Sequence, residues 1–545
     1  MNEFTITPSV DETQEFIEIA NDFSNPLDIV REAISNSFDA NARKVEIYFR
    51  VLQDFGESIL EIIIKDDGIG MDKEGLQSFF DLGNSKNRGN QEKIGEKGHG
   101  TKVFFNSTEI KVITRQKRIE YTAILANPIK NLHKRTIPPV TVKSQSTEKT
   151  DGTEIFILGY NANRRDRFTH DILKDYILWF TKFGSFEERL GIENLKNSTL
   201  ILQGLGRNEP EEIRFGHIFP PESKPVNDLF EQHLVAAPDH YCKQLVRSGH
   251  LKKFPEIAFE AIFSVEGNKV KQQSNPMLRR GGKNNPAGSY TVQERYGVWL
   301  CKDFIPVQRK NEWITYKGNE FIKFHAFFNC QKLRLTANRG SIDNTPTEYL
   351  DDIKNEIKSI FDEIVESDDW RQLAWLEQEA DAYKTSEKEK KDFDWRKKKI
   401  NKTNIAKYKN VILVEPERES GVFALVIQLS TIENNLFPFH ILDYDTHSGI
   451  DVIAKGDKTT PITLSKLCYV EFKYYLTEDF NHSFLNLHSV VCWETQLKHN
   501  SIAKDIAGDE RKFEITQPRD NNDYTHYYLT DSRSSYRIEV YVLKT

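Results

Sequence analysis

One stretch near the start of the chain, residues 26–42 (PLDIVREAISNSFDANA), limits most strongly what the chain can become. Its apolar residues recur every fourth position and predict a helix with one apolar stripe, formed by Val30, Ile34 and Phe38. Glu32, Asn36 and Asp39 stand at i, i+4 and i+7, so they share a different face of that helix. Burying two carboxylates and an amide without partners is costly, whereas a hydrated metal with a polyphosphate would supply partners. A solvated helix face is the alternative, and the residues downstream decide between the two.

Length, charge and cysteine content narrow the class of protein. A chain of 545 residues predicts three or four domains. No run of 18 apolar residues and no basic, apolar leader is present, so we expect a cytoplasmic protein without membrane contact. The five cysteines are scattered and form no CxxC pair, which argues against a zinc site and against disulfides. The net charge of −7 means that any nucleic-acid contact must come from local basic patches.

A second feature follows two predicted strands, residues 44–51 and 59–65. The second strand runs directly into Asp66-Asp67-Gly68-Ile69-Gly70-Met71. A carboxylate at the end of a buried strand can accept a hydrogen bond from an exocyclic amine such as that of adenine. Two glycines leave room for a planar ligand beside the backbone. The pattern DxGxG also occurs in ordinary turns, so it indicates a ligand site only together with the motifs around it.

A glycine-bearing segment follows, and it predicts phosphate binding. Residues 82–91 are polar, as expected of a lid, and three glycines precede the apolar residues 101–105, which predict the start of a helix. Free N–H groups and the positive end of a helix dipole attract anions. The P-loop pattern GxxxxGK[ST] is absent. Three more strands are predicted, at residues 109–115, 119–125 and 153–158.

The order ExxxNxxDA, DxGIGM, lid, GxxGxG and GTxI over residues 26–158 resembles the GHKL ATPase superfamily. That superfamily includes the large heat-shock chaperone, MutL, type II topoisomerase ATPase subunits, MORC proteins and histidine kinases. The stretch REAISNSFDA is especially similar to the chaperone's first motif. The resemblance implies an α/β sandwich over residues 1–195 that binds ATP with Mg²⁺. Since Glu32 is present and no phosphoacceptor-histidine helix is found, a histidine kinase is disfavoured.

The resemblance also implies a role for each matching residue. Glu32 would polarise the attacking water as general base, and Asn36 would complete the Mg²⁺ shell. Asp66 would read adenine, and Asp39 would order that end of the site. The other cofactor-binding positions implied are Gly68, Gly70 and Met71 near the base, Gly95, Gly98, Gly100 and Thr101 at the phosphates, and Thr153 near Asp66. Lys86 or Lys102 would add charge at the phosphates, and His99 would be neutral and peripheral.

The middle of the chain, residues 196–368, resembles the S5-like α+β transducer domain that follows GHKL modules in MutL and the topoisomerases. Strands are predicted at 296–305 and 321–330 and a long helix at 347–365. In those relatives a basic residue of this domain reaches the γ-phosphate; Lys332 is the first candidate here and Arg339 the second. Both could instead be surface charges. Residues 270–288 are basic and glycine-rich and predict an exposed loop, either solvated or contacting a phosphate backbone.

Residues 369–410 are dense in charge and predict a helical linker. The basic run Arg396–Lys399 lies beside Trp395, an aromatic side chain able to stack. A solvated helix is the simpler interpretation, and a DNA-contacting linker is the alternative.

A further domain is predicted from residue 411 to residue 545. Its pattern reads as a helix at 416–433, strand–turn–strand at 439–454, a strand at 467–476, and a helix or strand at 481–494. This order resembles the PD-(D/E)xK nuclease core of the restriction-endonuclease-like fold.

The predicted nuclease residues are few. Glu471 and Lys473 lie two apart on one strand, and therefore on one face, and Asp451 precedes them on the neighbouring strand. Asp451 and Glu471 would hold Mg²⁺ or Mn²⁺, Lys473 would orient a water, and Glu417 or Glu419 would supply a helix acid. The proline of the first family motif is absent. A β-rich partner-binding domain with a surface ion pair is the alternative.

Together these patterns predict an ATP-hydrolysing DNA endonuclease that forms a homodimer when ATP binds. Defence against foreign DNA, with a possible protein partner encoded in the same operon, is an expectation from the domain pairing alone. The second hypothesis is an ATPase clamp or chaperone-like switch whose C-terminal domain only binds a partner.

Overall fold

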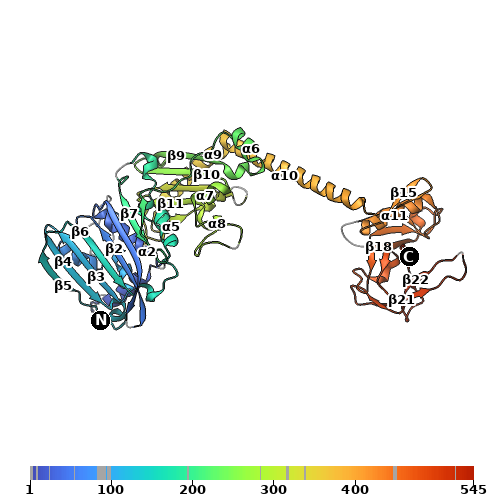
Figure 1. The fold of residues 1–545 in the computed structure, drawn as a ribbon, viewed down its shortest axis with the longest axis horizontal. Coiled ribbons are helices and arrows are strands. Elements are labelled where there is room, and N and C mark those ends of the chain that lie inside the picture. Colours follow the sequence, from blue (N-terminus) through green and yellow to red (C-terminus); the bar gives the residue numbers. More distant parts are fainter. Residues whose placement is uncertain are drawn as a thin grey trace. The chain divides into compact units, whose positions relative to one another are not determined.

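A computed structural model of the chain describes two compact units, Met1–Ser386 and Glu387–Thr545 (Figure 1). The described residues are 4–7, 10–23, 25–54, 56–82, 94, 100–192, 195–282, 284–314, 318, 320–336, 339–445, 451–521 and 523–544. Helix α10 (Asp368–Ile400) crosses the boundary between the units. Several sheets with helices make the chain a mixed α/β multidomain protein, which confirms the general fold class predicted.

The first unit opens with an eight-stranded sheet in the order β5-β4-β3-β6-β2-β1-β7-β8. Its strands are β1 (Lys44–Asp54), β2 (Glu57–Asp66), β3 (Glu109–Gln116), β4 (Ile119–Ala126), β5 (Thr141–Ser146), β6 (Gly152–Leu158), β7 (Thr199–Gln203) and β8 (Glu211–Arg214). The strands predicted from alternating apolar residues at 44–51, 59–65, 109–115, 119–125 and 153–158 all form, with ends that differ by a few residues.

The two faces of this sheet differ sharply in polarity. Strand register aligns Ile47, Ile64 and Ile155 in one buried row, and Ile62 lies beside Ile157 in the next. Helices cover this face: α1 (Glu12–Asn21), α2 (Asp28–Asp39), α3 (Lys73–Phe80), α4 (Pro128–His133), α5 (His170–Phe180) and the short 3-10 helix η1 (Gly100–Phe105). The opposite face carries ion pairs of Arg115 with Glu120 and Glu154. The result is a two-layer α/β sandwich.

A second, five-stranded sheet follows in the order β12-β11-β13-β10-β9. Its elements are β9 (Cys242–His250), β10 (Ala258–Glu266), β11 (Gly297–Lys302), β12 (Ile305–Arg309) and β13 (Phe324–Asn329), with helices α6 (Val226–His233), α7 (Asn268–Ser274), α8 (Val292–Arg295) and α9 (Thr347–Glu366). Phe324 and Phe328 pack towards α9. Phe327 and Ile262 face the other way and pack on Trp179 of α5, which joins the two sheets of this unit.

Two predictions in this region are wrong. The predicted strand at 296–305 is divided between β11 and β12, because Asp303 and Phe304 adopt positive φ angles of 55° and 61° and form a tight turn. The predicted exposed loop at 270–288 begins instead inside helix α7, and Met277 and Leu278 after it are buried in the first core. Residues 279–282 are exposed, as expected.

The second unit contains a hairpin, a helix and another sheet. The hairpin pairs β14 (Ile405–Tyr408) with β15 (Val411–Val414), and α11 (Glu419–Ile432) follows. The eight-stranded sheet has the order β16-β17-β18-β19-β23-β22-β21-β20. Its strands are β16 (His440–Tyr444), β17 (Val452–Lys455), β18 (Leu467–Leu476), β19 (Leu487–Thr495), β20 (Ile502–Lys504), β21 (Glu510–Thr516), β22 (His526–Thr530) and β23 (Arg537–Val542).

Both faces of this sheet are buried near its centre. α11 packs on the face that carries Val470 and Phe472, and Val490 and Val540 belong to a separate core. β18 runs antiparallel to β17 and parallel to β19. The restriction-endonuclease-like assignment of this unit stays a prediction. Within the described residues, no helix is long and apolar enough to cross a membrane.

Candidate functional site

A cavity of about 300 Å³, lined by both polar and apolar residues, lies between helix α2, the end of β2, α3 and η1. The residues of the sequence prediction that line it are Glu32, Asn36, Asp39, Asp66, Gly70, Met71, Gly100, Thr101 and Thr153. Residues from five separate elements or turns therefore meet around one cavity, in the arrangement expected of a nucleotide site.

Glu32 places a buried carboxylate at this cavity. Its Oε1 accepts a hydrogen bond from Arg31 Nε at 3.3 Å, and Arg31 also pairs with Asp28 at 3.1 Å. The backbone of Gly100 lies so close to Glu32 that a Cβ at this position would overlap Glu32 Oε2. A side chain at position 100 would displace the carboxylate of Glu32, and Gly100 and Thr101 at the start of η1 both line the cavity. η1 has six residues of 3-10 geometry and contains the predicted helix start at residues 101–105.

Asn36 lies one turn after Glu32 on α2. Its amide Nδ2 is buried and makes no hydrogen bond within the described part of the chain. A buried amide without a partner costs free energy, so it is the kind of group that a bound ligand satisfies. Carboxylate and amide oxygens suit Mg²⁺, which is usually held by few protein ligands together with phosphate and water. The donor set of α2 thus fits Mg²⁺ bound to a nucleotide.

Asp66 is the partly buried carboxylate at the end of β2 that lines the cavity. It accepts hydrogen bonds from Gly68 N at 3.0 Å and, at the longer distance of 3.5 Å, from Ser37 Oγ. Burial raises the pKa of Asp66 to about 6, despite these hydrogen bonds. Its neighbour Asp67 instead accepts hydrogen bonds from the backbone N–H groups of Arg43 and Lys44 at the start of β1, at 2.7 and 2.8 Å. Only the first of the two aspartates faces the cavity.

The glycines after Asp66 are explained by close backbone contacts, whereas the sequence predicted that they leave room for a planar ligand. A Cβ on Gly68 would lie 2.7 Å from the carbonyl oxygen of Ala40. Gly70 has a φ of 65°, and a Cβ there would overlap the carbonyl of Arg115. The close approach is thus to neighbouring backbone, and it fixes the turn that delivers Asp66. Gly68 itself does not line the cavity.

Lys102 lies elsewhere than the sequence suggests. Its side chain is fully buried, and its Nζ donates to the carbonyl oxygen of Phe79 at 2.9 Å and to Thr101 Oγ1 at 2.7 Å. Burial lowers the pKa of Lys102 to about 7. The amine therefore ties η1 to α3 and is not among the groups that line the cavity. Lys86, Gly95, Gly98 and His99 lie outside the described residues.

A chain of hydrogen bonds connects the cavity with the second sheet's domain. Asp39 Oδ1 accepts from the backbone N–H of Ile94 at 2.8 Å, and the carbonyl oxygen of Ile94 accepts from Arg339 Nη1 at 2.6 Å. Arg339 Nη2 also donates to Asp303 at 3.0 Å. Lys332, the first candidate for the γ-phosphate contact, is exposed. The second candidate, Arg339, is thus the one that contacts Ile94, which follows the predicted lid in the chain.

Two residues that sequence reasoning missed support the cavity. The Ser37 hydroxyl donates a hydrogen bond to Asp66, and nothing in the helical sequence pattern around Ser37 indicates this contact. Thr114 on β3 accepts a hydrogen bond from Met71 N at 2.8 Å and lies 3.2 Å from Thr153 Oγ1. Only the pairing of β3 with β6 brings these two threonines together, which a linear pattern does not reveal.

The second unit contains its own polar cluster around Glu471. This fully buried carboxylate pairs with Lys473 Nζ at 2.6 Å and with His482 Nε2 at 3.2 Å. Lys473 also lies 3.5 Å from Glu419 at the start of α11. Asp451 N donates to Glu471 Oε2 at 3.4 Å, and Asp451 Oδ2 accepts from the backbone N–H of Phe472 at 2.9 Å.

The cluster gathers Asp451, Glu471, Lys473 and Glu419, and it adds His482, which sequence reasoning missed. Glu417 is not part of it, because that carboxylate pairs with Lys399. Burial and then the charge of Glu471 raise the pKa of Asp451. Although burial opposes the change, hydrogen bonding and charge from Glu471 raise the pKa of Lys473.

Metal binding at this cluster rests on two carboxylates. In the described parts of the chain, no group of three or more His, Cys, Asp or Glu side chains is arranged to hold a metal ion. Mg²⁺ is commonly held by one or two carboxylates together with substrate phosphates. Asp451 and Glu471 therefore remain a compatible pair, but not a complete protein cage.

Comparisons with known proteins agree with the motif-based resemblance. Residues 25–154 match the family model described as histidine kinase-, DNA gyrase B-, and HSP90-like ATPase. The predicted GHKL-type ATPase domain is thereby confirmed over this range. No curated protein matches the chain. One of the matching solved structures, described as the crystal structure of the N-terminal domain of a DNA repair protein, has 12% sequence identity and a TM-score of 0.34; the match covers 64% of this chain and 98% of that one.

Proposed function

We propose that the first unit binds ATP with Mg²⁺ and hydrolyses it in the cavity formed by α2, β2, α3 and η1. The observation that carries this proposal is the meeting of Glu32, Asn36 and Asp66 around one cavity, inside the range that matches the ATPase family. Phosphoryl transfer to water needs positioning and charge stabilisation more than covalent chemistry. A buried carboxylate, an unsatisfied amide and backbone N–H groups supply those needs.

Each residue then has a distinct task. Asp66 accepts a hydrogen bond from the exocyclic amine of adenine, and Asn36 holds the metal that accompanies the phosphates. Glu32 orients the attacking water and takes its proton. Gly100 and Thr101 present the backbone of η1 to the phosphates. Bound Mg²⁺ would neutralise charge on the phosphate oxygens.

Substitution of the base tests this assignment. Glu32→Gln preserves the size of the side chain but cannot accept the proton, so turnover should fall at least about 100-fold while ATP affinity stays within about threefold. The measurements are phosphate release and binding of a fluorescent ATP analogue. Glu12→Gln, on the exposed first turn of α1, is the control and should behave as wild type. Unchanged turnover in Glu32→Gln would exclude this residue as the base.

We further propose that the second unit is a metal-dependent DNA endonuclease controlled by the ATPase. The convergence of Asp451, Glu471, Lys473 and Glu419 supports this proposal, because a buried acidic residue beside a lysine on a central strand is unfavourable unless both are used. The competing function is an ATPase clamp whose second unit only binds a partner. In that case the same cluster is a structural ion pair.

Nicking of supercoiled plasmid in Mg²⁺ or Mn²⁺ separates these two functions. Glu471→Gln and Lys473→Met should each abolish nicking without changing ATP turnover. Lys512→Ala, on the exposed side of β21, is the matched control and should retain nicking. If wild type nicks the plasmid and both site variants nick it equally well, the cluster is not the catalytic centre. If wild type does not nick DNA in the presence of ATP and metal, the partner-binding function is favoured.

A further inference from the structure

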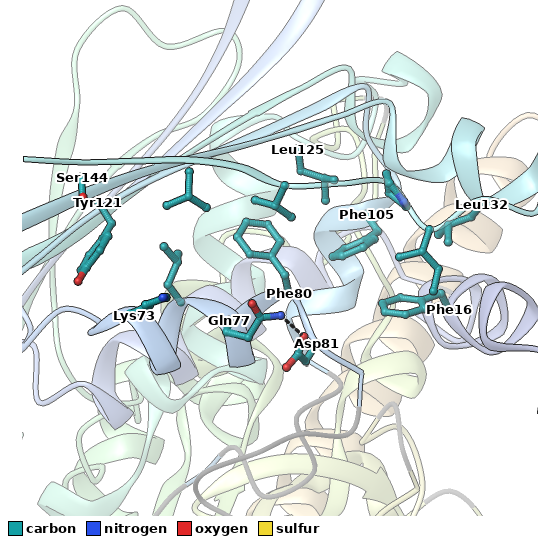
Figure 2. A pocket seen from close by; sticks show the side chains of 15 residues that line it. Phe16, Lys73, Gln77, Phe80, Asp81, Phe105, Tyr121, Leu125, Leu132 and Ser144 are labelled. Carbon is teal, nitrogen blue, oxygen red and sulfur yellow. Dashed lines mark hydrogen bonds between the residues drawn. The ribbon is translucent and has the colours of Figure 1, made fainter.

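A second cavity lies on the other side of helix α3 from the nucleotide site. Its volume is about 590 Å³, and it opens between α3 and strands β4 and β5 (Figure 2). Gly75, Ser78 and Phe79 of α3 line the nucleotide cavity. Leu76 and Phe80 line the second cavity, together with the polar residues Lys73 and Gln77. One short helix thus forms a wall of both cavities, with each face turned to one of them.

The two ends of the second cavity differ in polarity. Phe16, Phe105, Leu125 and Leu132 gather at one end, while Lys73, Tyr121 and Ser144 lie at the other (Figure 2). The strand register explains the polar end, because Tyr121 of β4 pairs with Ser144 of β5. Lys73 is exposed and makes no ion pair with another described residue. The volume lies in the range usual for small-molecule pockets.

We propose that this cavity binds an amphiphile with an elongated apolar body and an anionic head, such as a chain carboxylate. The apolar body would be buried against the phenylalanine and leucine side chains, which removes apolar surface of ligand and protein from water. The head would accept hydrogen bonds from Tyr121 and Ser144 and pair with Lys73. At this end a cationic head would meet the ammonium group of Lys73, whereas the carboxylate of Asp81, which also lines the cavity, accepts a hydrogen bond from Gln77.

Occupancy of this cavity acts on nucleotide binding through α3; this part rests on the proposed function of the first unit. Phe79 lines the nucleotide cavity, and its carbonyl oxygen also accepts a hydrogen bond from the buried amine of Lys102. A ligand packed on Phe80 and Leu76 holds α3 in the position that completes the nucleotide wall. Once the first ligand has ordered α3, the second ligand pays less conformational entropy to bind against it. The two ligands should therefore bind with positive cooperativity.

Displacement of the fluorescent aromatic sulfonate ANS by decanoate tests the binding site in the full-length protein. Decanoate should displace it at least about tenfold more strongly than decan-1-ol or decylamine, since only the carboxylate gains a charge-assisted hydrogen bond. Val142→Trp should fill the cavity mouth and abolish displacement. Lys143→Trp is the matched control, because the neighbouring β5 residue points to the opposite face of the sheet. Lys73→Met should remove the preference for decanoate over decan-1-ol.

Equal displacement by the carboxylate, alcohol and amine would overturn the proposal, as would identical binding by Val142→Trp and Lys143→Trp. For the coupling, saturating decanoate should lower the Kd of Mg-ATP at least about fivefold, and Mg-ATP should tighten decanoate by the same factor. Normal nucleotide binding without this reciprocal effect would overturn the coupling alone. Absence of nucleotide binding, with decanoate still bound, would overturn the proposed function and leave the amphiphile site in place.

Discussion

Single residues decide the chemistry of the nucleotide cavity, and Asp66 is the most informative of them. Its carboxylate is partly buried at the end of β2, and the loss of hydration there raises its pKa to about 6. Because the folded-state pKa is higher than the ordinary value of 3.8, the folded protein binds the proton more tightly than the unfolded chain does. Stability contributed by this group is therefore fully present below about pH 4 and is lost as the pH rises through 6.

Asp66→Asn should change both stability and nucleotide binding in a pH-dependent way. Removing the buried charge should raise the Tm of the ligand-free protein at pH 8 by several degrees but have little effect near pH 4, measured by calorimetry. In wild type, ATP affinity should fall as the pH drops below about 6, because the protonated carboxyl is a poorer acceptor for the adenine amine. The variant should show weak affinity at every pH. A wild-type affinity independent of pH between 5 and 8 would contradict this role for Asp66.

The position of a single residue can be predicted from sequence where local periodicity decides it. Glu32, Asn36 and Asp39 meet the cavity because helical spacing alone places them on one face. Lys102 could not be located in this way, because its burial depends on a hydrogen bond to Phe79, 23 residues away. A linear sequence gives no sign that a lysine before an apolar run will donate to the backbone of another helix.

At the scale of elements, the contact between Arg339 and Ile94 links the part of the chain that contains the second sheet to the nucleotide cavity. Arg339 has a positive φ of 58°, follows β13 in the chain, and holds the carbonyl of Ile94 while Asp39 holds its N–H. We propose that this arrangement transmits a change at the nucleotide to the part of the first unit that contains the second sheet. Sequence reasoning ranked Lys332 above Arg339, and the 245-residue separation between Ile94 and Arg339 explains why no local pattern distinguishes them.

Arg339→Ala should lower ATP turnover by about tenfold, the effect of losing roughly one hydrogen bond of a charged group. Lys332→Ala is the matched control and should stay within about twofold, since Lys332 is exposed. Steady-state phosphate release measures both. A large loss of ATP turnover in Lys332→Ala, with unchanged turnover in Arg339→Ala, would favour Lys332 as the γ-phosphate contact and contradict the link through Arg339.

Element boundaries were predictable where periodicity was long. β18 spans the same residues as its predicted strand, Leu467–Leu476, and α9 ends one residue beyond its prediction. The break between β11 and β12 is not predicted from the sequence, because the two residues with positive φ angles are Asp303 and Phe304, and neither is a glycine or an asparagine. α7 was missed because its basic, polar surface resembles a loop, while its buried side chains depend on neighbours distant in sequence.

For the whole molecule, we expect nucleotide binding to drive the association of two copies. Glu32→Gln should accumulate as a dimer in Mg-ATP because hydrolysis no longer resets it, whereas nucleotide-free protein should remain monomeric. Light scattering across a concentration series measures the mass of both states. A mass that does not change with ATP in wild type and in Glu32→Gln would contradict the predicted cycle, without bearing on whether ATP binds.

The claim on which everything else depends is that the cavity beside α2 binds Mg-nucleotide through Asp66. Calorimetric titration of the full chain with Mg²⁺ and a non-hydrolysable ATP analogue tests it most directly, with Asp66→Asn beside Asp67→Asn. We expect saturable binding to wild type and to Asp67→Asn, since the Asp67 side chain faces the backbone of β1, and at least about tenfold weaker binding to Asp66→Asn. No binding to wild type, or equal binding by both variants, would contradict it.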